Sequence, residues 1–346
     1  MDNISVSKCN INNRRYLGNK YTLNGFIREV VDGHCKDINS VLDIFSGTGS
    51  VAYAFIDKVV FTNDMLYSNY ICNYAWFSSE PFDEEKIMKL INEYNNLYVK
   101  EENYMTTNFS NTFFSTDDCS KIGFIRESIE KKYNLKEINS REKAILITSL
   151  IYGMDRIANT VGHYDAYIKT TTDFKKLVLP YPNVPKYNNT LNKCFNLNAN
   201  DLAPLIEADL VYLDPPYNSR QYCDAYHLLE NVARWDKPEV YGVAKKMDRS
   251  SLKSEYCGKN APFALDDLIE KIRSKYILLS YNSTGNKRNA RSNARISDDE
   301  IQKILEKKGK VMVFSKNYKT FSTGKTKTSK NEERLFLCIC GVKDND

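Results

Sequence analysis

The stretch SVLDIFSGTGS, residues 40–50, decides the fold expected of this chain of 346 residues. It opens as a short apolar run, typical of a buried strand, and turns through two glycines into VAYAFIDK, which can form a helix. The next run, VVFTND at residues 59–64, is again rich in β-formers and closes on an acid. Strand, loop, helix and strand in this order predict a βαβ unit of a parallel sheet.

A second strand-rich region comes later in the chain. ADLVYLDPPY, residues 208–217, predicts a strand that ends in a Pro-Pro turn, and KYILLSYNS, residues 275–283, predicts another. Two further runs, at 311–314 and 335–340, flank a basic turn and predict an antiparallel hairpin at the sheet edge. The expected fold class is therefore α/β, with a mostly parallel sheet and a C-terminal antiparallel hairpin.

Residues 81–187, between these halves, show amphipathic helical patterns such as EEKIMKLINEYNNLYV and little strand signal. The proline-containing run LVLPYPNVPKYNN, residues 177–189, has the composition of a linker back to the sheet. We therefore expect one domain built from residues 1–80 and 188–346, with residues 81–187 inserted into it as a largely helical domain.

Composition narrows the class of protein. A hydrophobic fraction of 42% and a charged fraction of 27% are typical of a globular chain. The first residues lack the layout of a signal peptide and no apolar run is long enough to span a bilayer, so we expect a cytoplasmic protein that binds no membrane. Nine scattered cysteines without C-x-x-C pairs and three histidines predict neither a zinc site nor a disulfide framework, and no metal.

Positive charge is concentrated late in the sequence, although the net charge is only +5. Lys287, Arg288, Arg291 and Arg295 lie in a stretch without acids, and residues 315–330 carry five lysines and no acid. Such loops are suited to phosphate contacts, but a solvated charged loop explains them equally well.

Two candidate sites come directly after predicted strands, where ligands bind in parallel α/β sheets. In the first, Asp43 leads into the glycine loop and Asp64 lies 21 residues later, about the spacing of a ribose-binding acid. Dinucleotide and methionine-nucleoside sites share this pattern. Ala52 stands where a third glycine would fall, which makes a NAD site less favoured. The second site, Asp214-Pro215-Pro216-Tyr217, combines a carboxylate, a rigid turn and an aromatic face, which a plain strand-ending turn does not require.

These motifs, with RYLGNK at residues 15–20 and Asn63-Asp64, resemble those of the α-group, Dam-like adenine-N6 DNA methyltransferases in order and spacing. The strings DPPYNSRQYCDAYHLLENVARW and NTVGHYDAY are most similar to the FokI-type modification methyltransferases. The resemblance implies a Rossmann-like, S-adenosylmethionine-dependent methyltransferase sheet in which residues 81–187 form the target-recognition domain. It also implies duplex DNA as the substrate, and it favours a modification enzyme with a cognate restriction endonuclease.

The resemblance further assigns roles to single residues. Tyr16, Gly18 and Lys20 would hold the methionine end of the cofactor, and Lys20 would neutralise its carboxylate. Asp64 would accept hydrogen bonds from the ribose hydroxyls, and the Asn200-Asp201 pair would approach the cofactor adenine. The full expected cofactor set is Tyr16, Gly18, Lys20, Asp43, Phe45, Gly47, Gly49, Asp64 and Asp201.

The chemistry of the adenine amine gives the tetrad its expected catalytic role. The N6 lone pair is delocalised into the ring, so the nitrogen is a poor nucleophile until its hydrogens are held. Asp214 and the Pro215 carbonyl can accept these hydrogens, and Tyr217 can stack on a base flipped out of the duplex. The catalytic set is Asp214, Pro215, Pro216 and Tyr217, and the expected DNA contacts are Arg220, Tyr222, Lys287, Arg288 and Arg291.

Other functions remain open at this stage. The tetrad also suits RNA adenine or cytosine-N4 as the acceptor, because each is an exocyclic amine. A NAD-dependent oxidoreductase leaves DPPY and RYLGNK unexplained, and a non-catalytic DNA-binding protein leaves the intact tetrad unexplained. His163 and His227 have no readable carboxylate or metal spacing, so a structural or DNA-contact role is favoured for both.

Overall fold

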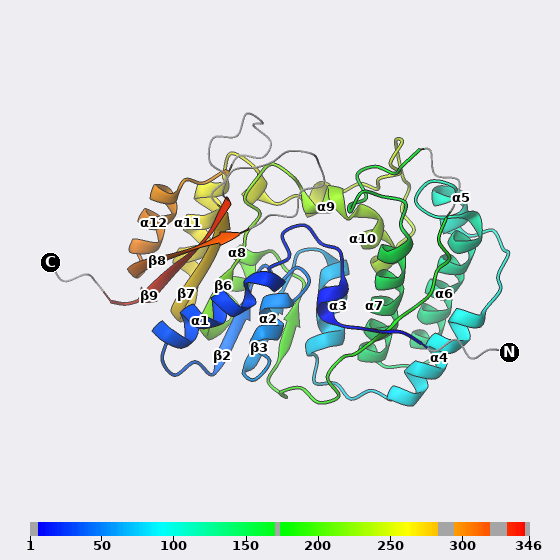
Figure 1. Ribbon diagram of the computed structural model, residues 1–346, viewed down its shortest axis with the longest axis horizontal. Coiled ribbons are helices and arrows are strands. Elements are labelled where there is room, and N and C mark those ends of the chain that lie inside the picture. Colours follow the sequence, from blue (N-terminus) through cyan, green and yellow to red (C-terminus); the bar gives the residue numbers. More distant parts are fainter. Residues whose placement is uncertain (1–5, 170–173, 283–293, 319–330, 343–346) are drawn as a thin grey trace. The chain divides into compact units, whose positions relative to one another are not determined.

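The computed structural model describes residues 6–169, 174–282, 294–318 and 331–342. The chain divides into two compact units (Figure 1). The helical unit consists of residues 1–19, 66–192 and 223–250, and the sheet unit of residues 20–65, 193–222 and 251–346. Lys287, Arg288 and Arg291, expected to contact DNA, lie outside the described residues.

Within the described residues, the sheet unit contains one seven-stranded sheet. Its strands in spatial order are β5 (Lys193–Phe195), β3 (Val59–Asn63), β2 (Ser40–Asp43), β6 (Glu207–Leu213), β7 (Arg273–Asn282), β9 (Asn331–Cys340) and β8 (Gly309–Tyr318). The first five pair in parallel, whereas β9 is antiparallel to both of its neighbours. The predicted mostly parallel sheet with a C-terminal antiparallel hairpin is confirmed.

Helices cover both faces of this sheet (Figure 1). Because side chains alternate along a strand, Leu210 packs on the face covered by α1 and α2, and Val211 on the face covered by the other helices. The helices of this unit are α1 (Asn24–His34), α2 (Ser50–Ala54), α8 (Ala199–Leu202), α11 (Ala261–Lys271) and α12 (Asp298–Glu306), with 3-10 turns η2 (Tyr21–Leu23), η3 (Ala203–Leu205) and η5 (Glu255–Cys257).

The helical unit packs around α7 (Ser140–Ile157), which contacts α3, α4, α6 and α10. Asn139 begins α7 with a capping box, accepting from the Glu142 N–H while the Glu142 carboxylate accepts from the Asn139 N–H. The other elements are α3 (Tyr67–Phe77), α4 (Glu84–Asn96), α5 (Tyr104–Phe109), α6 (Thr116–Asn134), α10 (His227–Arg234), the 3-10 turn η1 (Ile11–Asn13), and a parallel strand pair, β1 (Lys8–Cys9) with β4 (Tyr181–Pro182).

Two short elements, α9 (Tyr222–Ala225) and η4 (Ser250–Leu252), begin where the chain leaves one unit for the other. The chain passes from the sheet unit to the helical unit near residue 66 and returns to the sheet unit near residue 192. Residues 223–250 also belong to the helical unit. The assignment of residues 81–187 to target recognition stays a prediction. No helix in the described ranges is both long and apolar enough to cross a bilayer.

Candidate active site at the carboxyl edge of the sheet

Four acidic side chains meet one edge of the sheet. Asp43 ends β2, Asp64 comes directly after β3, and Asp214 directly after β6, so parallel pairing places all three at the carboxyl edge. Since β9 runs the other way, Glu333 near its beginning reaches the same edge, opposite Asn282 at the end of β7. The topology therefore gathers the two predicted sites into one.

The glycine loop is shaped by its backbone. Gly47 and Gly49 have φ values of 49° and 78°, in the left-handed region that favours glycine. The Gly47 N–H donates to Oδ2 of Asp64 at 2.9 Å, and the Asn63 carbonyl accepts from the Ser46 N–H at 2.9 Å. The loop is thus fixed to the end of β3 by hydrogen bonds on both sides of the turn.

Asp43 is buried beneath this loop. Its Oδ2 accepts from the Ala52 N–H at 3.2 Å, while its Oδ1 has no hydrogen-bond partner in the described part of the chain. Burial, followed by the nearby charge of Asp214, holds the pKa of Asp43 well above its ordinary value. A buried carboxyl group with one unused oxygen is suited to a cationic or hydrogen-bond-donating ligand.

Lys20 lies between two carboxylates. Its ammonium donates to Oε1 of Glu333 at 2.6 Å and lies 3.2 Å from Oδ1 of Asp214. Ser280 of β7 donates to the same Glu333 oxygen at 2.7 Å. Burial raises the pKa of Asp214 to about 6, with Lys20 opposing this shift and Glu333 adding to it. Asp214 is thus mostly ionised at neutral pH but more basic than an ordinary aspartate.

The rest of the tetrad continues from Asp214 along the turn. Pro215 is buried, and its carbonyl oxygen accepts no hydrogen bond from the residues that the structure describes. The half-buried Tyr217 ring meets the ring of Tyr281 edge-on at 6.3 Å between centroids. The Tyr217 carbonyl accepts from the Arg295 N–H at 2.9 Å, which fixes the turn. A carboxylate, an available carbonyl and an aromatic ring therefore lie together within one four-residue turn.

Phe45 is positioned through a chain of contacts to α11. Its ring meets that of Tyr256 edge-on at 5.1 Å, and the Tyr256 hydroxyl donates to Oδ1 of Asn200 at 2.8 Å. The Asn200 amide in turn donates to the Ala264 carbonyl. Asn200 is thus occupied in packing, whereas Asp201 is exposed in the first turn of α8.

Tyr16 and Gly18 belong to the helical unit. The Tyr16 ring stacks on that of Tyr226 at 4.6 Å, and its hydroxyl accepts from the Asn69 amide at 3.0 Å. The Leu17 N–H donates to the Tyr226 hydroxyl, and Gly18 has a φ of 78°. Stacking and hydrogen bonds therefore fix Tyr16 and Leu17 within this unit.

The charge balance of the edge fits a cationic cofactor. Asp64, Asp214 and Glu333 supply carboxylates and Asp43 supplies a buried carboxyl group with a raised pKa, whereas Lys20 supplies one ammonium. The carboxylates outnumber the ammonium even without Asp43, so the edge suits a ligand with a sulfonium and an amino group. Phe45 offers an aromatic face, and Asp64 offers a carboxylate beside the glycine loop. These are the groups that a nucleoside needs, so the residues fit S-adenosylmethionine.

Comparison with known families agrees with this geometry. A family model described as D12 class N6 adenine-specific DNA methyltransferase matches residues 16–287. The chain belongs to this family. The resemblance to adenine-N6 DNA methyltransferases of the FokI type is thereby confirmed.

Several curated modification enzymes are similar to this member of the family. Modification methylase StsI of Streptococcus sanguinis is 36% identical over 84% of this chain and 46% of its own length. Type II methyltransferase M.FokI of Planomicrobium okeanokoites is 34% identical over 85% of this chain and 47% of its own. Type II methyltransferase M.NlaIII of Neisseria lactamica is 29% identical over 90% of this chain and 93% of its own length. The chain spans about half the length of the first two relatives.

The remaining residues expected at the site of this family member differ in their surroundings. Arg220 is exposed, and its N–H donates to Asn218 Oδ1 at 2.9 Å. Tyr222 begins α9 and is half-buried. His227 is fully buried in the helical unit, with Nε2 2.9 Å from the Tyr164 carbonyl, and burial lowers its pKa to about 4. This burial favours a structural role for His227, which stays a prediction.

Glu333 and Ser280 were not predicted from the sequence. A signal was present, because Glu333 lies just before an apolar run that was predicted to be antiparallel. The beginning of an antiparallel strand lies at the edge where parallel strands end, so polar residues there share the site.

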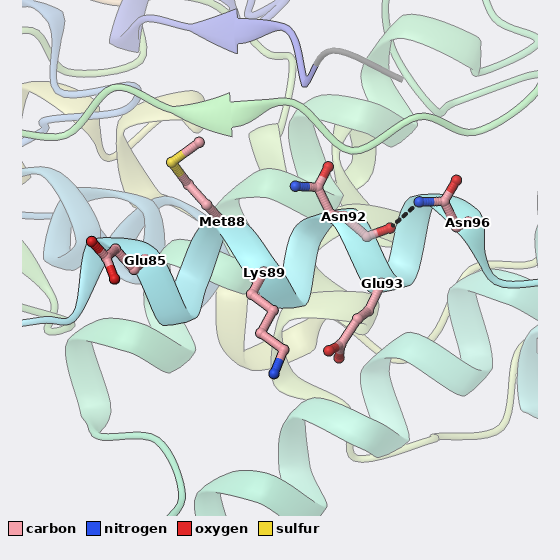
Figure 2. A pocket seen from close by; sticks show the side chains of 6 residues that line it. All are labelled: Glu85, Met88, Lys89, Asn92, Glu93 and Asn96. Atoms are coloured by element: carbon pink, nitrogen blue, oxygen red, sulfur yellow. Dashed lines mark hydrogen bonds between the residues drawn. The ribbon is translucent and has the colours of Figure 1, made fainter. Parts of the chain in front are cut away.

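A shallow hollow lies on α4 of the helical unit. Figure 2 shows the side chains that line it, all from one exposed helix face: Glu85, Met88, Lys89, Asn92, Glu93 and Asn96. Two acids and one lysine make this face unsuited to phosphate. Nor does any group of three or more His, Cys, Asp or Glu side chains in the described ranges have a metal-binding arrangement.

Proposed function

We propose that this protein transfers the methyl group of S-adenosylmethionine to the N6 amine of adenine at a specific sequence in duplex DNA. The observation that carries the proposal is that two acceptors, the Asp214 carboxylate and the Pro215 carbonyl, and the Tyr217 ring lie within one turn, at the edge where the glycine loop also lies. Membership of the D12 class supports the same acceptor.

In this mechanism the protein holds the amine and removes its delocalisation. The amine hydrogens point to Asp214 and to the Pro215 carbonyl, which makes the nitrogen more tetrahedral and frees its lone pair. Asp214 is basic enough to accept a hydrogen bond strongly while remaining ionised at neutral pH. S-adenosylmethionine supplies a methyl group on a cationic sulfonium. Tyr217 stacks on the flipped adenine and fixes it for in-line transfer, and as the product forms the N6 nitrogen loses one proton, through Asp214 to solvent.

The cofactor would be held by the residues named from the sequence. Phe45 and the glycine loop line the nucleoside, and Asp64 accepts from the ribose hydroxyls. Lys20 already has two carboxylate partners, Asp214 and Glu333. It would bind the methionine carboxylate with the third N–H of its ammonium. The same proposal includes Tyr16, Gly18, Asp43 and Asp201.

Sequence recognition is proposed for the inserted helical segment, residues 81–187. Arg220, Tyr222, Lys287, Arg288 and Arg291 would contact the DNA, the charged ones mainly at phosphates. The similarity to type II modification enzymes favours a restriction–modification system with a cognate endonuclease. Action on cellular DNA would place the enzyme in the cytoplasm.

The test is methyl transfer from labelled cofactor to duplex DNA, to RNA and to no acceptor, with identification of the modified base. Label in N6-methyladenine of duplex DNA is expected. Label only in RNA, or in N4-methylcytosine, would assign the tetrad to a different exocyclic amine. Exchange of residues 81–187 with those of a relative of different specificity should change the methylated sequence, and an unchanged target in a folded exchange would move recognition elsewhere.

A further inference from the structure

Glu333 is a buried carboxylate that contacts one ammonium group and one hydroxyl group. Its side chain is 2% exposed, on β9 inside the sheet rather than at the sheet's margin. A buried carboxylate is costly unless it is paired and hydrogen-bonded. Lys20 supplies the pairing charge at 2.6 Å and Ser280 supplies a hydroxyl donor at 2.7 Å, both on Oε1.

The Lys20 ammonium is shared unequally. It lies closer to Glu333, at 2.6 Å, than to Asp214, at 3.2 Å. If Lys20 paired with Asp214 alone, its whole charge would act on that carboxylate and make it a weaker acceptor. With Glu333 present, the ammonium remains beside Asp214 while it also pairs with, and hydrogen-bonds to, a second carboxylate whose negative charge opposes its effect on Asp214.

We propose that Glu333 is a positioning residue for methyl transfer, which anchors the Lys20 ammonium beside Asp214 and takes up part of its charge, so that Asp214 remains a strong hydrogen-bond acceptor. This inference rests on the proposed function of Asp214. It adds to the DPPY tetrad a residue more than a hundred positions later in the chain, with no motif of its own.

Other groups also face Asp214 and must be considered together. Asp43 on β2 is a second acid, and Tyr212 and Tyr217 come from β6 and the turn after it. The pKa of both tyrosines is raised, first by burial, so they stay neutral near pH 6. Glu333 and Lys20 act on the pKa of Asp214 in opposite directions, and the two contact each other directly.

The experiment removes the Glu333 charge and measures the titration of Asp214. In Glu333→Gln the amide oxygen still accepts from Lys20, but the full ammonium charge acts on Asp214. We expect the Asp214 carboxyl, monitored by ¹³C NMR in the protein without cofactor or DNA, to titrate about one pH unit lower. The acid limb of the single-turnover methylation rate should move the same way, and the rate at neutral pH should fall severalfold.

A second variant and a matched control make the outcome decisive. Glu333→Asp keeps the charge but withdraws it from Lys20, so we expect a smaller shift in the same direction. Glu142 is equally buried, at 2% exposure, and pairs with Lys86 at 2.7 Å in the helical unit. Glu142→Gln should lower stability without moving the Asp214 titration.

The result that overturns the inference is an Asp214 titration identical to wild type in a folded Glu333 variant. Failure of the proposed function looks different. It is near-normal methylation by Asp214→Ala, whatever the Glu333 variants do.

Discussion

Each unit of this protein contains a buried ion cluster, and the two clusters differ in what surrounds them. In the helical unit Arg14 lies 3.8 Å from Asp155, whose other oxygen accepts from the Tyr164 hydroxyl at 2.9 Å. In the sheet unit Lys20 lies between Glu333 and Asp214. The Asp155 side chain is 6% exposed, whereas that of Asp214 is 20% exposed. One cluster is enclosed, and the other opens at the sheet edge.

The comparison shows that a shifted pKa does not by itself mark a functional group. Burial raises the pKa of Asp155 and of Asp214 alike, each to about 6, with a cation opposing the shift. Asp214 is distinguished by its position at the carboxyl end of a parallel strand, with an available carbonyl and an aromatic ring beside it. Asp155 lies in the interior of the helical unit, with Arg14 and Tyr164 as its partners.

The largest expected effect separates the two acids by rate. Asp214→Ala removes an acceptor for an amine hydrogen, and loss of one such contact costs about 3 kcal/mol, roughly a hundredfold or more in single-turnover methylation. Cofactor binding should largely persist, and Asp214→Asn should be milder because an amide oxygen still accepts. Asp155→Ala should lower the melting temperature while leaving the rate per folded molecule within about threefold.

The second effect concerns the aromatic face beside Asp214. Tyr217→Ala loses a stacking surface worth about 1–3 kcal/mol per base, so single-turnover methylation should fall about tenfold or more. Tyr217→Phe keeps the face and should retain most activity. If both variants were equally impaired, the hydroxyl rather than the ring would be the important group, and the stacking role would be wrong.

A smaller effect tests the proposed contact between Lys20 and the methionine carboxylate of the cofactor. Lys20→Ala should weaken cofactor binding about tenfold, measured by calorimetry, with DNA affinity nearly unchanged, because its proposed ligand is the methionine carboxylate. Lys86→Ala, which removes the lysine of the Lys86–Glu142 pair, is the matched control and should affect neither ligand. Equal losses for cofactor and DNA would count against the assignment.

The smallest effect is on stability. Burial raises the pKa of Asp155 in the folded protein to about 6, above its unfolded-state pKa near 4. Such a carboxyl group contributes its full stabilisation at pH values below the unfolded-state pKa and loses it as the pH rises through the folded-state pKa. Asp155→Asn removes this loss, so its melting temperature should drop a few degrees less than wild type between pH 4 and pH 7. An identical pH dependence would mean that Asp155 is not titrating in this range.

The sheet and the tetrad were predictable because their signals are local. The glycines of residues 40–50 and the DPPY turn each mark, within a few consecutive residues, where a strand ends and which kind of turn the chain then makes. The hairpin was also predictable from two apolar runs around a basic turn. Parallel pairing then requires that Asp43 and Asp214 share an edge, as they do.

The partners of Lys20 were not predictable, because they depend on register. The sequence favoured a ligand carboxylate, whereas the structure gives Lys20 two carboxylates of its own chain. Glu333 reaches it only because β9 lies between β7 and β8 with Glu333 opposite Asn282. A shift of one residue would turn Glu333 to the other face of the sheet.

The position of β9 between β7 and β8 also sets an order of assembly. β8 comes before β9 in the chain but touches the sheet only through it. During synthesis, residues 309–318 therefore emerge from the ribosome with no strand to join and must wait for residues 331–340 to emerge in turn. The sheet can therefore gain β8 only with or after β9, and it is the pairing of β9 with β7 that delivers Glu333 to Lys20.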